Sequence, residues 1–165
     1  MTDQPDDVLR PLGAPIDVDS FLGGLPFPVV AFLDAPRHAV IATHGPDGEL
    51  WQAVVWYALT GDAVLMNSLL GRRWSDDLRR DPRLSMTVFD GEDYVILTGR
   101  AVVLDDPDRA MAEARALARR YGGDPDAHVG QHRLRVLFEP GRARMHGRLK
   151  RVDEGRHGPG DEDQS

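Results

Sequence analysis

Residues 67–82 read Asn67-Ser-Leu-Leu-Gly-Arg-Arg-Trp-Ser-Asp-Asp-Leu-Arg-Arg-Asp-Pro82, and this stretch decides the fold because it joins a strand to a helix through a turn. Gly71 allows the sharp turn, since glycine reaches backbone conformations that other residues avoid. Pro82 ends the helix because it cannot continue one and also disfavours the helical conformation at Asp81. The sequence therefore predicts a strand, a turn and a short helix in this order.

The same stretch combines features that bind anions. The first turn of a helix exposes unpaired N–H groups at the positive end of the helix dipole. Arg72 and Arg73 add forked, permanently charged donors suited to phosphate, and Ser68 offers a hydroxyl group. The alternative is a surface helix with solvated arginines, which is the favoured interpretation when the stretch is considered alone. The neighbouring sequence therefore has to decide between the two.

Short strand-like runs surround this stretch and are separated by turn residues. A helix is expected at Pro28–Leu33, and a longer one begins near Asp105 and stops at Gly122. Gly99 interrupts the longest run and predicts a bulge or a close approach of two backbones. The expected strands are Arg37–Thr43, Leu50–Leu59, Ala63–Asn67, Leu84–Phe89, Tyr94–Leu104, Arg133–Phe138 and Arg142–His146. Six or seven antiparallel strands with two or three helices predict a mainly β protein built on a small barrel.

Length and charge predict one domain with two acidic tails. A chain of 165 residues is long enough for a single buried core. Residues 1–19 hold five aspartates and one arginine, and residues 153–165 hold five acidic residues and one arginine. Each segment has a net charge of −4, whereas residues 20–152 have a net charge of +1, and neither segment has apolar periodicity. The expected organisation is therefore a barrel domain at 20–150 between disordered tails at 1–19 and 151–165.

Composition also excludes several classes of function. The chain has no cysteine, an acidic start without an apolar leader, and no apolar run long enough to span a bilayer, so a cytoplasmic, non-membrane protein is expected. Net acidity disfavours nucleic-acid binding. His128 and His132 have the spacing of metal ligands on a helix, but Gly130 weakens that helix and no third ligand is evident. Surface or structural roles for both histidines, and no metal site, are the expectation.

Three motifs carry a resemblance to a known family. They are Gly71-Arg-Arg-Trp74, Leu78-Arg-Arg-Asp-Pro-Arg83 and Tyr94-Val-Ile-Leu-Thr-Gly-Arg-Ala101. Together they resemble the pyridoxamine-phosphate-oxidase-like superfamily over residues 27–147, and in particular its branch that uses the deazaflavin coenzyme F420. The resemblance implies an antiparallel, FMN-binding-like split β-barrel that dimerises and holds a flavin-type ring at the dimer interface. Trp74 stands where many relatives carry lysine.

The resemblance also implies where the cofactor lies. The ring is expected against the strand Leu50–Tyr57. The phosphate is expected at residues 67–82, the arginine stretch. Trp56 and Tyr57 have an alternative role as aromatic residues of the core or of the dimer interface. The expected cofactor-binding residues are Trp51, Gln52, Ala53, Val54, Val55, Asn67, Ser68, Arg72, Arg73, Trp74 and Tyr94.

The function that this resemblance implies is an oxidoreductase, with hydride passing between F420 and a small conjugated or hydrophobic organic substrate. No catalytic side chain is named, because no acid or base stands out in the sequence. The alternatives are an FMN-dependent oxidoreductase or oxidase of the same fold, and a non-catalytic flavin or deazaflavin carrier or sensor. A homodimer is expected in each case.

Overall fold

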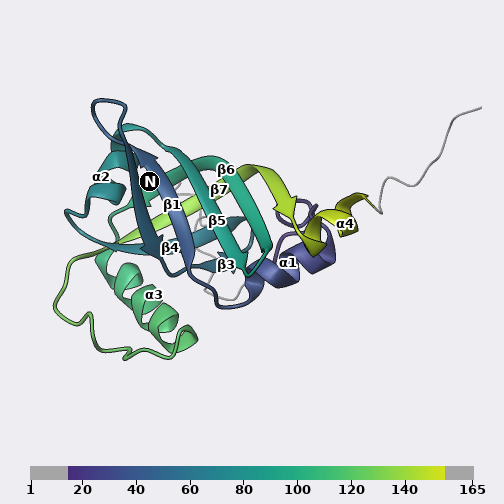
Figure 1. Ribbon diagram of the computed structural model, residues 1–165. Coiled ribbons are helices and arrows are strands. Elements are labelled where there is room, and N and C mark those ends of the chain that lie inside the picture. The colour runs from purple at the N-terminus through teal and green to yellow at the C-terminus, as the bar shows by residue number, and fades with distance from the viewer. Residues whose placement is uncertain (1–14, 155–165) are drawn as a thin grey trace, which may run out of the picture.

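The computed structural model describes residues 15–154 (Figure 1). Over this range the chain forms one seven-stranded sheet and four helices. The elements in chain order are α1 (Phe27–Asp34), β1 (Ala39–His44), β2 (Leu50–Val55), β3 (Ala58–Thr60), β4 (Ala63–Leu69), α2 (Arg73–Arg80), β5 (Arg83–Asp90), β6 (Asp93–Leu104), α3 (Pro107–Arg120), β7 (Arg133–His146) and α4 (Arg148–Glu154).

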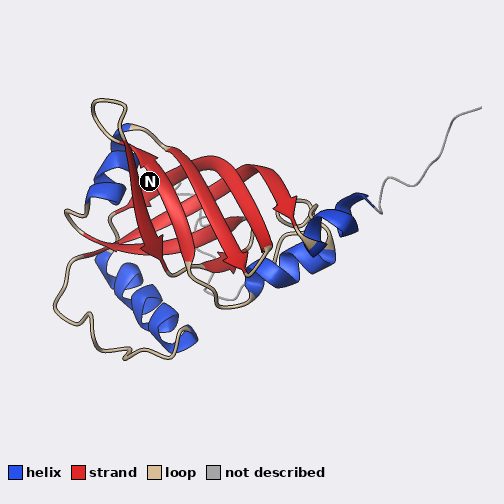
Figure 2. Cartoon of the chain, viewed as in Figure 1, coloured by secondary structure: helices blue, strands red, loops and turns tan. Residues whose placement is uncertain are grey.

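The strands form one strongly curved layer in the order β2-β1-β5-β6-β7-β4-β3, and every pair of neighbours is antiparallel. The helices lie at the two ends of this layer, with α2 and α3 at one end and α1 and α4 at the other (Figure 2). Alternate residues of β1 and β5 point into the core, as a half-buried strand requires. The observed class is the mainly β, split-barrel fold that the sequence predicts.

Gly99 lies at a bulge, as its position in the sequence predicts. The β6–β7 register shifts between Thr98 and Gly99, and a Cβ added to Gly99 would lie 2.1 Å from the carbonyl oxygen of Glu139. The two strands expected on either side of Glu139-Pro140-Gly141 are one continuous strand, β7. Pro140 is accommodated because it pairs with Gly99 at the bulge, where the ladder is already disrupted. The expected break between two strands at this place is therefore wrong.

The strand expected at Leu50–Leu59 is also wrong, because it divides into β2 and β3 at opposite edges of the sheet. The break falls at Trp56 and Tyr57. The Tyr57 N–H donates to the hydroxyl oxygen of Tyr121 at 3.1 Å, and the buried Tyr57 hydroxyl donates to the Leu33 carbonyl at 2.6 Å. These bonds satisfy the tyrosine with groups outside the sheet, so the chain leaves one edge and crosses to the other.

Helices α1, α2 and α3 lie where the sequence predicts helices, whereas α4 is not predicted. Asp106 caps α3 by accepting a hydrogen bond from the Arg109 N–H, and Pro107 occupies the first turn. Helix α4 ends at Glu154, so its last four residues lie in the segment expected to be a tail from residue 151. The other residues of both expected tails, apart from 15–19, lie outside the described residues. No helix in the described range is long and apolar enough to cross a membrane.

Candidate functional site

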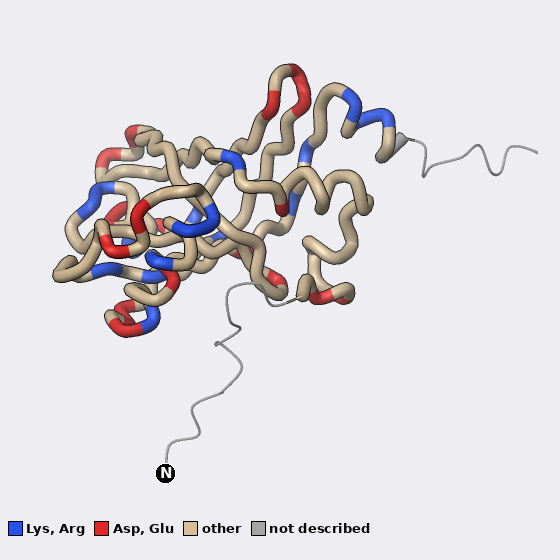
Figure 3. The backbone as a smooth tube through the Cα atoms, turned by 90° about the horizontal axis from the view of Figure 1, so that it is seen from below, with Lys and Arg blue, Asp and Glu red and all other residues tan. Residues whose placement is uncertain are grey.

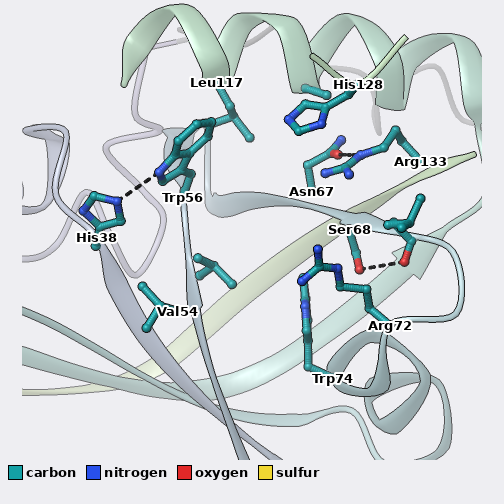
Figure 4. A pocket seen from close by; sticks show the side chains of 13 residues that line it. His38, Val54, Trp56, Asn67, Ser68, Arg72, Trp74, Leu117, His128 and Arg133 are labelled. Carbon is teal, nitrogen blue, oxygen red and sulfur yellow. Dashed lines mark hydrogen bonds between the residues drawn. The ribbon is translucent and has the colours of Figure 1, made fainter. Parts of the chain in front are cut away.

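A pocket of about 370 Å³ opens at the end of the sheet that carries α2 and α3 (Figure 4). It brings together segments that are far apart in the sequence, namely β2, β4, the start of α2, α3 and the start of β7. In Figure 4, Asn67, Ser68, Arg72, His128 and Arg133 lie on one side together with Trp74, and Val54, Trp56 and Leu117 lie on the other side together with His38. The lining residues are His38, Val54, Val55, Trp56, Asn67, Ser68, Leu69, Arg72, Trp74, Ala114, Leu117, His128 and Arg133.

Arg133 is the most firmly positioned cation of the pocket. Its Nε donates to Oδ1 of Asn67 at 2.7 Å, and one terminal nitrogen donates to Oε1 of Gln131 at 3.0 Å. Both partners are uncharged amides, so they fix the guanidinium without neutralising it. Burial, and then the nearby charge of Arg72, lower the pKa of Arg133. The pocket therefore holds a half-buried positive charge that an anion would stabilise.

Asn67 connects Arg133 to helix α3. The side-chain nitrogen of Asn67 donates to the carbonyl oxygen of Ala110 at 2.8 Å, while its oxygen accepts from Arg133. The amide orientation is thus set from both sides, because its nitrogen can only donate and its oxygen can only accept. Asn67, an expected cofactor-binding residue, lies in the pocket with this positioning role.

Arg72 enters the pocket from the turn before α2, where Gly71 has a φ of +83°. Its side chain is exposed, and no carboxylate within the described residues forms an ion pair with it. The turn is held by two serines, since the Ser75 hydroxyl donates to the Arg72 carbonyl at 2.9 Å and the buried Ser68 hydroxyl lies 3.0 Å from Ser75 Oγ. Ser68 and Arg72 therefore lie together at the pocket, as the sequence predicts.

The charge of the pocket is entirely positive or neutral, because none of its lining residues is Asp or Glu. This contrasts with the described chain as a whole, in which basic and acidic residues are interspersed (Figure 3). His128 lies in the same pocket. Burial first, and then the charge of Arg133, lower its pKa. Because the charge of Arg72 contributes to lowering the pKa of both Arg133 and His128, an anion in the pocket would relieve this repulsion.

Arg73 lies apart from this pocket, although it is adjacent to Arg72 in sequence. Its guanidinium covers the ring of Trp51 at 4.4 Å from the ring centre, and it forms ion pairs with Glu49 and Asp77. The two expected phosphate-binding arginines thus point to different places, because Arg72 precedes the helix and Arg73 begins it. Trp51, Gln52 and Ala53 also do not line the pocket, whereas Val54 and Val55 of the same strand do.

Tyr94 lies at the opposite end of the sheet from the pocket. It pairs with His146 near the start of α4, and the two rings stack with their centres 4.7 Å apart. Asn67 pairs instead with Arg135, whose partner in β6 is Leu104 at the far end of that strand. Within one chain the structure does not bring Tyr94 to the pocket residues, because strand β6 spans the full length of the sheet between them.

Trp56 forms the aromatic wall. Its ring stacks on Tyr121 at 5.0 Å between centres and 7° between planes, and its Nε1–H donates to Nε2 of His38 at 3.1 Å. Leu117 of α3 and Val54 of β2 lie on the same side (Figure 4). Trp74 is almost fully buried and contributes to the pocket from the core. Tyr57 is a core residue, which is one of the two roles expected for it.

Several pocket residues are absent from the sequence-based prediction, notably His38, Leu117 and Arg133. Arg133 stands opposite Leu69 in the β4–β7 pairing, and such long-range pairing leaves no local pattern. His128 and His132 point to separate surroundings, because His132 Nε2 lies 2.7 Å from Asp105 Oδ1. Within residues 15–154, no group of three potential metal-ligating side chains lies together.

The sequence from residue 28 to residue 147 matches the family model described as pyridoxamine 5'-phosphate oxidase. The chain belongs to this family. The match covers most of the described barrel and confirms the resemblance that the three motifs indicate. This family includes oxidoreductases, and its fold binds flavin-type cofactors. No curated protein matches the sequence.

The names of solved structures with the same fold point to different functions. An F420 reductase is 23% identical, with a TM-score of 0.62 over 69% of this chain and 94% of its own. A conserved hypothetical protein from Mycobacterium tuberculosis is 24% identical, with a TM-score of 0.65 over 74% of this chain and 85% of its own. The heme storage protein HutZ from Vibrio cholerae is 12% identical, with a TM-score of 0.62 over 74% and 95%. At these identities the neighbours show the split-barrel fold.

Proposed function

We propose that this protein is an oxidoreductase that binds coenzyme F420 at the pocket and transfers hydride between it and a small conjugated or hydrophobic organic molecule. The observation that carries the proposal is the pocket in which Arg72 and Arg133 lie without any acidic lining residue. One structural neighbour is named an F420 reductase, and three sequence motifs resemble that branch of the family.

The pocket residues fit the parts of such a cofactor. Arg72 and Arg133 would bind the phosphate through charge-assisted hydrogen bonds, and Ser68 would add a hydroxyl group. Edge strand β2 has only one neighbour in the sheet, so outward-facing N–H and C=O groups remain available to a planar ring. When bound, the deazaflavin would supply two-electron hydride chemistry, and the protein would supply binding and orientation.

The substrate side of the pocket would be apolar. Val54, Trp56 and Leu117 line this side and exclude water from a ring placed along β2. Trp56 is held in one orientation by its stack on Tyr121 and its bond to His38, so its face is preorganised. These residues would orient a flat, conjugated substrate against the ring without forming a covalent bond to it.

A second copy of the chain would complete the site. Leu50 is 67% exposed, Val54 is 66% exposed and Trp51 is 42% exposed, and all three lie on edge strand β2. Apolar side chains on an open strand edge favour burial against a partner. A homodimer formed here would cover the ring, and its interface would exceed about 2,000 Å² in total, as in many permanent dimers.

The test is a competition between F420 and FMN for the purified protein, followed by an assay of F420 oxidation with reducible conjugated compounds. We expect F420 to displace FMN at comparable concentrations, and the oxidation of reduced F420 to accelerate with at least one compound class. Tight FMN binding that excess F420 does not displace would instead assign the protein to FMN-dependent chemistry. Tight F420 binding without turnover on any compound would indicate a carrier.

A further inference from the structure

His128 lies in the pocket but outside the role proposed for the two arginines. It belongs to the loop between α3 and β7, and it is half-buried. Figure 4 shows its ring beside Asn67 and Arg133, with Arg72 on the same side of the pocket. A neutral imidazole is one proton away from being a third cation, which distinguishes it from the two permanently charged arginines.

Charged groups from three elements act on His128. Arg133 approaches from β7 and Arg72 from the start of α2, and both charges lower the pKa of His128 in addition to the main effect of burial. Asp124 in the same loop and a hydrogen bond with Gln131 act in the opposite direction. Asp124 also accepts a hydrogen bond from the Asp126 N–H at 2.9 Å. The neighbouring faces of α3 are apolar, through Ala114 and Leu117.

An anion between Arg72 and Arg133 would favour the protonated form of His128 over the neutral form. It would compensate the two positive charges that disfavour protonation, and it would offer an acceptor to the imidazolium. We infer that His128 is a third ligand of the pocket, neutral in the free protein and protonated when a phosphoryl group binds between Arg72 and Arg133. This inference rests on the anion-binding role that the proposed function gives to the pocket.

The consequence is that anion binding takes up a proton. Affinity should be highest at low pH, where His128 is already protonated, and should fall as pH rises through the range between its pKa in the free and in the bound protein. Above the pKa of the bound protein, only the two arginines hold the anion. The affinity then levels off at a lower value.

The probe for this inference is sulfate, because its charge stays constant across the relevant pH range. Histidine NMR of the full chain, with His128 assigned through His128→Gln, would follow the pKa of His128 with and without saturating sulfate. We expect sulfate to raise that pKa by at least about one unit, and sulfate affinity to be about tenfold higher near pH 5.5 than near pH 8. His128→Gln should bind sulfate with little dependence on pH.

His132→Gln is the matched control, because His132 is close in sequence but bonds to Asp105 outside the pocket. It should retain the pH dependence of the wild-type protein. A pKa of His128 that saturating sulfate leaves unchanged, or a His128→Gln variant with the wild-type pH dependence, would overturn the inference.

If sulfate behaves as expected but F420 does not bind, the inference holds and the proposed function fails. If F420 binds but sulfate affinity is independent of His128, the proposed function holds and the inference fails.

Discussion

The guanidinium of Arg133 is bound by the side-chain oxygen of Asn67 at 2.7 Å, from the neighbouring strand of the sheet. This bond joins the arginine stretch of the sequence to a strand that begins more than fifty residues later. It also leaves the positive charge of Arg133 uncompensated, because an amide carries no charge. Asn67 and Arg133 both line the anion pocket, and the first two of the following predictions concern this pocket.

Replacing Arg72 or Arg133 with alanine should weaken F420 binding at least about tenfold each, since a hydrogen bond to a charged group contributes about 1.5–3 kcal/mol. Arg73→Ala is the matched control. It removes an adjacent arginine that pairs with Glu49 and Asp77 outside the pocket, so affinity should change much less. Isothermal titration calorimetry checks this, and a greater loss for Arg73→Ala than for Arg72→Ala would contradict the assignment.

Asn67→Asp should weaken anion binding although it preserves the shape of the side chain. The new carboxylate would neutralise Arg133 and could no longer donate to the Ala110 carbonyl. Gln131→Glu places a carboxylate on the exposed side of the same guanidinium, where solvent screens it, so a smaller loss is expected. Equal affinity of Asn67→Asp and the wild-type protein in a binding titration would show that Arg133 does not bind the anion.

Val54→Glu should convert the proposed dimer to a monomer, because it places a charge on the exposed edge strand that the partner would cover. Sedimentation at micromolar concentration would measure the change in mass. Phe89→Glu is the control, since Phe89 is also exposed but lies in β5. A wild-type protein that sediments only as an 18.3 kDa monomer would refute the dimer outright.

Glu113→Ala should destabilise the fold by about 3–5 kcal/mol, because it leaves the buried charge of Arg135 without its partner. Arg135 donates from Nε to both oxygens of Glu113 at 2.9 Å, and both residues are buried between α3 and β7. Asp126→Ala breaks the exposed pair with Arg115 and should cost less than about 1 kcal/mol. Urea denaturation of both variants compares the free energies of unfolding. If both variants lost a similar free energy of unfolding, the buried pair would contribute no more to stability than the exposed pair.

The sequence predicts those parts of the structure that depend on neighbouring residues. The turn at Gly71, the end of α2 before Pro82 and the bulge at Gly99 follow from the conformational limits of glycine and proline. Ser68 and Arg72 reach the pocket for the same reason, because a single turn places them together.

The remaining features depend on long-range packing. Arg133 reaches the pocket only through the β4–β7 register, and the break at Trp56 and Tyr57 depends on a hydrogen bond from the Tyr57 N–H to the hydroxyl oxygen of Tyr121, more than sixty residues away. Arg72 and Arg73 diverge because one precedes the helix and the other begins it, so adjacent residues point in different directions. No local pattern in the sequence distinguishes these outcomes.

The most direct test of the central claim compares F420 with the same deazaflavin truncated before its phosphate. Equilibrium binding to the wild-type protein and to the Arg72→Ala, Arg133→Ala double variant would measure what the phosphate contributes at this pocket. The account predicts that the wild-type protein prefers F420 by at least about tenfold and that the double variant loses this preference. Equal binding of both molecules to the wild-type protein, or a preference that survives in a folded double variant, would contradict the assignment of the phosphate to Arg72 and Arg133.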